Sequence, residues 1–128
     1  MDKICKITAV SLIILLLTGV LTGCSQYRCR DEARKYGESA VFYAEQYLNG
    51  NISAEDAYEN ICAVRDELND YCDETHNDNL NSDIKFCENM LSLDVKILVS
   101  QFLIEKWNGG RAGDIKETVS KIKEEISY

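Results

Sequence analysis

The stretch IKFCENMLSLDVKILVSQF, from Ile84 to Phe102, decides the fold, because its apolar residues recur with the period of an α-helix. These residues form an apolar stripe along one side of the predicted helix: Ile84, Cys87, Leu91, Val95, Leu98 and Phe102. Other apolar residues of this region lie off the stripe, namely Ile97, Val99, Leu103 and Ile104. A helix that is apolar on several faces is normally surrounded by protein. We therefore expect this segment to be the most buried helix, with Trp107 at its end closing the core.

Three further segments have apolar stripes of the same period. The first stripe is Cys29, Ala33, Tyr36, Ala40, Tyr43 and Tyr47; the second is Ala57, Ile61, Val64, Leu68 and Cys72; the last is Ile115, Val119, Ile122 and Ile126. No segment shows the two-residue alternation of a β-strand. Four amphipathic helices with short connections form an up-and-down bundle. The predicted fold class is therefore all-α, a small antiparallel up-and-down four-helix bundle.

Residues typical of helix ends separate the four stripes. The first helix is expected to stop at Asn49-Gly50, because glycine readily takes the left-handed conformation that ends a helix. Ser53 is a typical N-cap for the second helix. A polar stretch from Asp73 to Asp83 favours turns and predicts a loop before the third helix. Asp114 is expected to cap the last helix, with Glu117 three residues later as in a capping box.

The beginning of the chain has the charge and hydropathy pattern of an export signal. Lys3 and Lys6 precede a run of seventeen uncharged residues, from Ile7 to Gly23. The run closes with Leu21-Thr22-Gly23-Cys24, which resembles the lipobox of bacterial lipoproteins. In that family the cysteine thiol receives a diacylglyceryl group, the leader is cut just before the cysteine, and the new amino terminus can also be acylated.

This resemblance implies a lipoprotein signal peptide at residues 1–23 and an acidic helical bundle at residues 24–128. Fatty acyl chains such as palmitate on Cys24 would anchor the bundle in membrane lipid, since two or three chains give stable anchoring. We therefore expect a lipid-anchored protein on the extracytoplasmic face of the cell membrane or cell envelope. Two alternatives stay open: an ordinary signal peptide, or an uncleaved membrane span, for which seventeen residues are at the short limit.

The chain is acidic and its charge is unevenly distributed. The net charge is −8, and without the leader twelve basic and 21 acidic residues leave −9, so repulsion from phosphates excludes nucleic acid as a partner. The basic residues near Cys24 are Arg28, Arg30, Arg34 and Lys35. These four are expected to lie near the membrane, against anionic headgroups. From Glu38 to Asp83 the net charge is −11, which suits a basic envelope protein or a cationic peptide; ordinary solvated helix faces are the alternative.

The cysteines of an exported protein are expected to form disulfides. Cys5 leaves with the leader and Cys24 carries the lipid, which leaves Cys29, Cys62, Cys72 and Cys87. Cys62 and Cys72 are ten residues apart on one helix. This spacing is about 15 Å along a helix, beyond the ~4.4–6.8 Å that a disulfide tolerates between Cα atoms. Counted from the first turn, Cys29 and Cys72 lie at the same level, so we predict Cys29–Cys72 and Cys62–Cys87, with unpaired thiols as the alternative for each pair.

Catalytic and metal-binding patterns are weak. The only histidine, His76, is expected to be a solvated residue of an acidic loop with Glu74, Asp78 and Asp83, and that loop lacks the glycine and twelfth ligand of a calcium hand. The cysteine spacing matches no zinc finger or ribbon, and His76 has no recognisable nucleophile partner. We therefore expect no metal site, no cofactor and no enzyme. A buried carboxylate pair with strongly raised pKa values would favour an enzyme instead.

The expected function is protein interaction or envelope structure. Five tyrosines concentrate on the first two helices: Tyr36, Tyr43, Tyr47, Tyr58 and Tyr71. Either they line the edge of the core, with buried rings and solvent-exposed hydroxyl groups, or they form a groove for a ligand. The alternative function is accordingly a binding module that takes a cationic ligand or peptide on its acidic, tyrosine-rich helix face.

Overall fold

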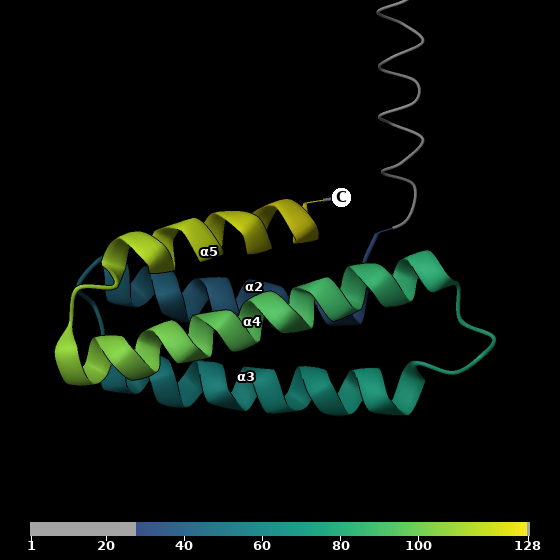
Figure 1. The fold of residues 1–128 in the computed structure, drawn as a ribbon, viewed down its shortest axis with the longest axis horizontal. Helices are drawn as coiled ribbons and strands as arrows, with labels where there is room; N and C mark the ends of the chain where they lie inside the picture. The colour runs from purple at the N-terminus through teal and green to yellow at the C-terminus, as the bar shows by residue number, and fades with distance from the viewer. Residues whose placement is uncertain (1–27, 128) are drawn as a thin grey trace, which may run out of the picture.

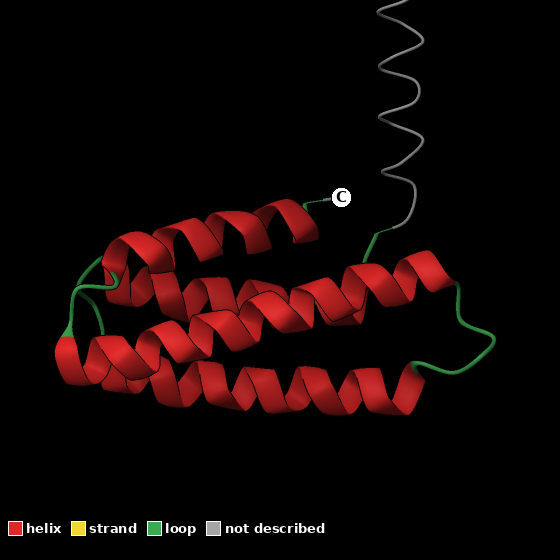
Figure 2. Cartoon of the chain, in the orientation of Figure 1, coloured by secondary structure: helices red, strands yellow, loops and turns green. Residues whose placement is uncertain are grey.

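The structure, a computed structural model, describes residues 28–127. This part of the chain contains the helices α2 (Asp31–Leu48), α3 (Ala54–Thr75), α4 (Ser82–Asn108) and α5 (Ala112–Ile126), and no strand (Figure 2). The predicted all-α four-helix bundle is therefore confirmed. The predicted leader at residues 1–23 and the lipid-bearing Cys24 lie outside the described residues.

The helices run up and down. Each helix packs on the next along the chain, and α5 packs back on α2, which closes the bundle (Figure 1). The α2–α3 and α4–α5 connections lie at one end of the bundle. The other end holds the α3–α4 loop, the start of α2 and the end of α5. Segments that are far apart in the sequence therefore meet at this second end.

Two of the predicted helix ends are confirmed. Helix α2 ends at Leu48, and Gly50 follows with a φ of 79°. The Oγ atom of Ser53 accepts a hydrogen bond of 3.1 Å from the backbone N–H of Asp56, as an N-cap does. Gly109, directly after α4, has a φ of 66°, a conformation that costs glycine little.

Two predicted boundaries differ. The loop between α3 and α4 covers only residues 76–81, because Asn81 caps α4 early by accepting a bond of 2.8 Å from the N–H of Asp83. The prediction that Asp114 caps the last helix is wrong, because α5 begins at Ala112. Asp114 lies within the first turn, where its charge suits the helix dipole, and it contacts Arg111 at 3.2 Å.

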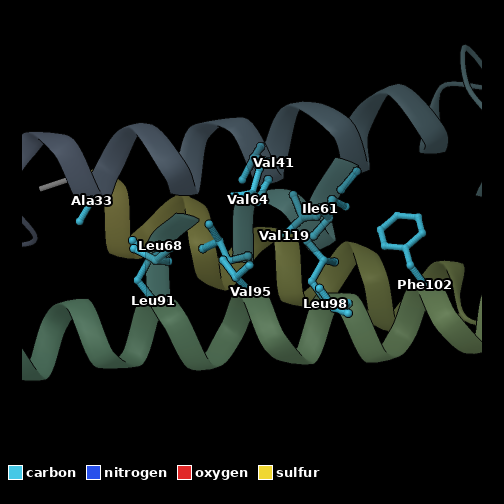
Figure 3. Close-up of a cluster of buried hydrophobic side chains, with 14 of the residues drawn as sticks. Ala33, Val41, Ile61, Val64, Leu68, Leu91, Val95, Leu98, Phe102 and Val119 are labelled. Atoms are coloured by element: carbon cyan, nitrogen blue, oxygen red, sulfur yellow. The ribbon is translucent and has the colours of Figure 1, made fainter. Parts of the chain in front are cut away.

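The core follows the predicted stripes of α3, α4 and α5 (Figure 3), whereas Tyr36, Tyr43 and Tyr47 of the first stripe are only partly buried. Its fully buried large side chains are Ile61, Leu68, Leu91, Val95, Leu98, Phe102, Ile115 and Ile122. Helix α2 contributes mainly small residues to this core: Ala33, Gly37, Ala40 and Ala44. A Cβ atom on Gly37 would lie 2.7 Å from Cγ2 of Ile126 and 3.1 Å from Cδ1 of Leu91. The small residues therefore let α4 and α5 approach α2 closely.

Helix α4 has the most buried residues of the four described helices, but the expectation that it is buried on several faces is wrong. Val99 is buried, but Ile97, Leu103 and Ile104 are 39%, 43% and 37% exposed, and Trp107 is 74% exposed and does not close the core. One face of α4 fills the core, and no other described helix covers the opposite face. Within residues 28–127, no helix combines the length and the low charge needed to cross a bilayer.

Candidate functional site

The carboxylate of Glu88, on α4, is completely buried and accepts four hydrogen bonds. Three come from Arg30, in the segment before α2. Its backbone N–H and its Nε reach Oε2 at 2.9 and 3.0 Å, and its Nη2 reaches Oε1 at 2.7 Å. The fourth joins Oε1 to Nε2 of His76, directly after α3, at 2.8 Å. The carboxylate therefore ties three segments together at the second end of the bundle.

Side chains from the last turns of α3 complete this group. The Nη2 atom of Arg30 also donates to Oγ1 of Thr75 at 2.7 Å, and the guanidinium lies 4.9 Å from the ring centre of Tyr71. The Thr75 hydroxyl in turn donates to the carbonyl of Tyr71 at 2.7 Å. Together, Arg30, Tyr71, Thr75, His76 and Glu88 are called the Glu88 cluster below.

The Glu88 cluster holds a true ion pair. Burial alone would raise the pKa of Glu88, but the hydrogen bonds from Arg30 and His76 outweigh burial and lower that pKa. The bond to Glu88 raises the pKa of the Arg30 guanidinium. Removing one partner of a buried pair typically costs about 3–5 kcal/mol, because a charge is left uncompensated. The cluster is therefore a structural clamp on the chain before α2.

Sequence reasoning missed Glu88 and misjudged His76. The expectation of a solvated loop histidine is wrong, because the His76 side chain is only 13% exposed and bonds to Glu88. A signal for Glu88 was present in the sequence. It stands four residues after Ile84 and three before Leu91, so it occupies the inward face of α4.

Two of the four predicted membrane-proximal basic residues are bonded within the bundle. Arg30 belongs to the Glu88 cluster, and Nε of Arg34 donates to the carbonyl of Ile126 at 2.9 Å. Arg28 and Lys35 are exposed. Contact with anionic headgroups stays a prediction, and it depends on these last two side chains.

The predicted disulfides are not the arrangement in the structure. All four described cysteines are thiols, and Sγ of Cys29 lies 2.6 Å from Sγ of Cys87. The predicted pairs Cys29–Cys72 and Cys62–Cys87 are therefore wrong, because Cys29 and Cys87 contact each other instead. The bond from Cys29 lowers the pKa of Cys87 to about 7, and the same contact raises the pKa of Cys29.

The physical reason is the path of the chain before α2. Because α2 begins at Asp31, Cys29 is not part of that helix and does not follow its register. The segment instead crosses the end of the bundle toward α4, where Arg30 binds Glu88 and Cys29 meets Cys87.

A groove between α2 and α3 gathers acidic and aromatic side chains. It has a volume of about 200 Å³ and is lined by Glu32, Tyr36, Glu67, Asp70, Tyr71 and Glu74. The rings of Tyr36 and Tyr71 lie 6.0 Å apart, centre to centre. Burial and the nearby carboxylates Glu32 and Glu67 raise the pKa of Tyr36. We call this feature the acidic groove.

The remaining predicted tyrosines lie elsewhere. The Tyr47 hydroxyl donates to Glu105 at 2.6 Å, and Lys106 lies 4.4 Å from the ring centre of Tyr58. Tyr43 packs edge-on against the exposed Phe42. Of the five tyrosines, only Tyr36 and Tyr71 therefore share the acidic groove.

One carboxyl group, that of Glu125 on α5, has the strongly raised pKa that was named above as favouring an enzyme. Asp94, on α4, is buried, and its carboxylate contacts Glu125 of α5. Burial, the hydrogen bond to Asp94 and the repulsion between the two groups raise the pKa of Glu125 to about 9. Neither residue lines the acidic groove. The pair alone provides no place for a substrate, and the absence of enzymatic activity stays a prediction.

The outward faces of the neighbouring helices α3 and α4 contrast in chemistry. Helix α3 exposes ten residues, of which eight are acidic. Between Phe86 and Trp107, α4 also exposes ten residues, of which only Lys96 is charged. Seven of these ten are apolar: Phe86, Met90, Leu93, Ile97, Leu103, Ile104 and Trp107, each between 37% and 74% exposed. We call these seven residues the α4 outer face.

No family model, no curated protein and no solved structure matches this chain.

Proposed function

We propose that the protein is a lipid-anchored, extracytoplasmic interaction module that binds a partner protein through the α4 outer face. The observation that carries the proposal is the contrast between α3 and α4. In an acidic chain, the ten residues that α4 exposes between Phe86 and Trp107 include a single charge. Aromatic side chains bury about 150–250 Å² each, and exposed apolar patches of a few hundred Å² commonly mark interaction sites.

The proposed partner element is an amphipathic helix. Phe86, Met90, Leu93 and Ile97 follow one another at spacings of 4, 3 and 4 residues, and Ile104 and Trp107 continue the same line. This is the spacing with which one helix packs along another. Phe86 and Trp107, at the two ends, are the most exposed of the seven and are suitable anchors.

The proposed anchor is Cys24. The resemblance of Leu21-Thr22-Gly23-Cys24 to a lipobox supports it, and the position of the first described helix is compatible with it. Seven residues lead from Cys24 to Asp31, which at ~3.3–3.6 Å per residue is a reach of at most about 25 Å. The domain would therefore stay near the bilayer, within reach of membrane proteins.

The test of the interaction is a pair of charge substitutions on the α4 outer face, Leu93→Glu with Ile97→Glu. Both side chains are partly exposed, so we expect a change of less than about 1 kcal/mol in the free energy of unfolding. We expect loss of the proteins that co-purify with the wild type from solubilised membranes. The matched control is Ala63→Glu on the exposed face of α3, which should keep them. Unchanged co-purification by the double variant would contradict the proposal.

The test of the anchor is the mass of the amino-terminal peptide. We expect a peptide that begins at Cys24 and carries a diacylglyceryl group, and release of the Cys24→Ala variant from the membrane fraction. The control Cys62→Ser should stay membrane-bound, because Cys62 lies within the bundle. An intact leader with an unmodified Cys24 would contradict the anchor.

A second candidate function is supported by the acidic groove. Its four carboxylates and two tyrosine rings suit a lysine or arginine side chain of a cationic peptide, through charge and cation–π contact. An oligolysine peptide should bind the purified protein, and binding should weaken with added salt. Glu67→Gln with Asp70→Asn should weaken it further, and the exposed Glu117→Gln on α5 should not. Equal binding by both variants would contradict this candidate.

A further inference from the structure

Three potential metal ligands converge beside the α3–α4 loop. Cys72 and His76 are four residues apart, so they lie on the same side of the last turn of α3, and Glu88 faces them from α4. Sγ of Cys72, a ring nitrogen of His76 and a carboxylate oxygen of Glu88 all lie within 4.8 Å of one another. Among the described residues, this is the one such group of three ligands.

We propose that Cys72, His76 and Glu88 bind one zinc ion. A thiolate, an imidazole and a carboxylate are the ligand types that zinc takes in proteins, and three protein ligands leave a fourth position for water or another molecule. Cys72 is 7% exposed and Glu88 is fully buried. Ligands on rigid helices and shielded from solvent need little reorganisation to bind an ion.

The present contacts fit an ion of this size. Nε2 of His76 and Oε1 of Glu88 now share a hydrogen bond of 2.8 Å. An ion between them would replace the shared proton. With Zn–N and Zn–O distances of about 2.0–2.2 Å in a tetrahedral site, these two atoms would move to about 3.4 Å apart. A Zn–S distance of about 2.3 Å would place the Cys72 sulfur about 3.6 Å from that oxygen. The three ligand atoms now lie within 4.8 Å of one another, so the sulfur is already close to this position.

Arg30 acts on this site in two opposing ways. Its backbone N–H and Nε hold Oε2 of Glu88, and its Nη2 donates at 2.7 Å to Oε1, the oxygen that faces His76 and would bind the ion. Such outer partners of a ligand help to fix its geometry. The positive charge of the guanidinium also repels a divalent ion. We therefore expect weaker binding than at a closed site with four protein ligands.

The sulfur contact at Cys29 leaves the Cys72 thiol available. Because Cys29 contacts Cys87, an oxidant would join those two residues before either reaches Cys72. Cys62 is ten residues from Cys72 on the same helix, about 15 Å away along the axis. We therefore expect Cys72 to remain a thiol in an oxidising compartment.

The test is a titration with Co²⁺, which reports its ligands by absorption. The protein is purified in detergent as the Cys29→Ser, Cys87→Ser variant, with a phosphine reductant, so that the other thiol pair cannot bind the ion. We expect one equivalent of Co²⁺ to produce visible bands of a four-coordinate site and a near-ultraviolet thiolate band. Added Zn²⁺ should displace the cobalt and abolish both.

Further substitutions in the same background assign the ligands. Cys72→Ser should abolish the thiolate band, His76→Gln should abolish both bands, and the matched control Cys62→Ser should keep them. Far-UV circular dichroism checks that each variant stays helical, and zinc content after dialysis gives a readout independent of colour. Absence of a thiolate band in the helical parent, or a band that survives Cys72→Ser, would overturn the proposal. Either result leaves the proposed role of the α4 outer face unaffected.

Discussion

Replacing Glu88 by Gln tests whether the Glu88 cluster clamps the chain before α2. Glutamine preserves the shape of the side chain but removes its charge and turns one acceptor into an N–H₂ donor. The N–H₂ group would take the place of Oε1 or Oε2 and would face the N–H groups of Arg30, so donor would meet donor. Arg30 supplies three of the four hydrogen bonds to Glu88.

The expected cost follows from those contacts. Hydrogen bonds to charged groups contribute about 1.5–3 kcal/mol, and breaking a buried ion pair costs about 3–5 kcal/mol. The Arg30 side chain is 31% exposed, so water partly compensates its charge. We therefore expect a loss of about 3 kcal/mol in the free energy of unfolding, at the lower end of the range for a buried pair.

The assay is urea unfolding of metal-free protein at neutral pH, followed by circular dichroism. With a slope of about 1–3 kcal/mol per molar urea, the midpoint should fall by roughly 1–3 M. The control Glu117→Gln, at an exposed site of α5, should change stability by less than about 0.5 kcal/mol. A double variant with Arg30→Gln should lose less than the sum of the two single losses, because the charges are coupled. A loss below about 1 kcal/mol for Glu88→Gln would refute the clamp.

Three further predictions concern the core, the carboxyl pair and the cysteines. Phe102→Ala should cost about 3–5 kcal/mol, whereas Trp107→Ala should cost little because Trp107 is 74% exposed; equal losses in thermal unfolding would contradict this packing. The raised pKa of Glu125, about 9, destabilises the fold increasingly as the pH rises from about 4.3, since the unfolded carboxyl ionises and the folded one does not. Glu125→Gln should therefore stabilise the protein at pH 8 and not at pH 4, and an equal effect at both would argue against it. Under mild oxidation, peptide mapping should find a Cys29–Cys87 disulfide, worth about 4 kcal/mol in the loop-entropy model; a link from Cys29 to another cysteine would show that the chain before α2 follows a different path.

The parts of the fold that were predictable depend on local spacing. Ile61 and Leu98 are buried because they belong to apolar stripes of helical period, and Ser53 caps α3 because its hydroxyl reaches an unpaired N–H. Each inference needs only neighbouring residues. The loop at residues 76–81 was predicted too long, because polar residues near Asp73 also fit the exposed side of a helix.

The parts that were not predictable depend on contacts between distant segments. The partner of Cys29 is set by the path of two or three residues before α2, which no periodicity describes. His76 was expected to be solvated because its sequence neighbours are loop residues, while Glu88 reaches it from twelve residues away. Periodicity identified the inward stripe of α4, but it does not show whether apolar residues off that stripe are covered by another helix, so the exposed Ile97 and Ile104 were expected inside.

Site-specific photo-crosslinking in intact cells tests directly whether the α4 outer face is the interaction surface. A photoreactive amino acid replaces Ile97 in one variant and Glu59, on the exposed acidic face of α3, in another. We expect a discrete crosslinked partner from position 97 and none from position 59. A partner captured only from position 59, or no adduct from position 97 in a correctly localised protein, would contradict it.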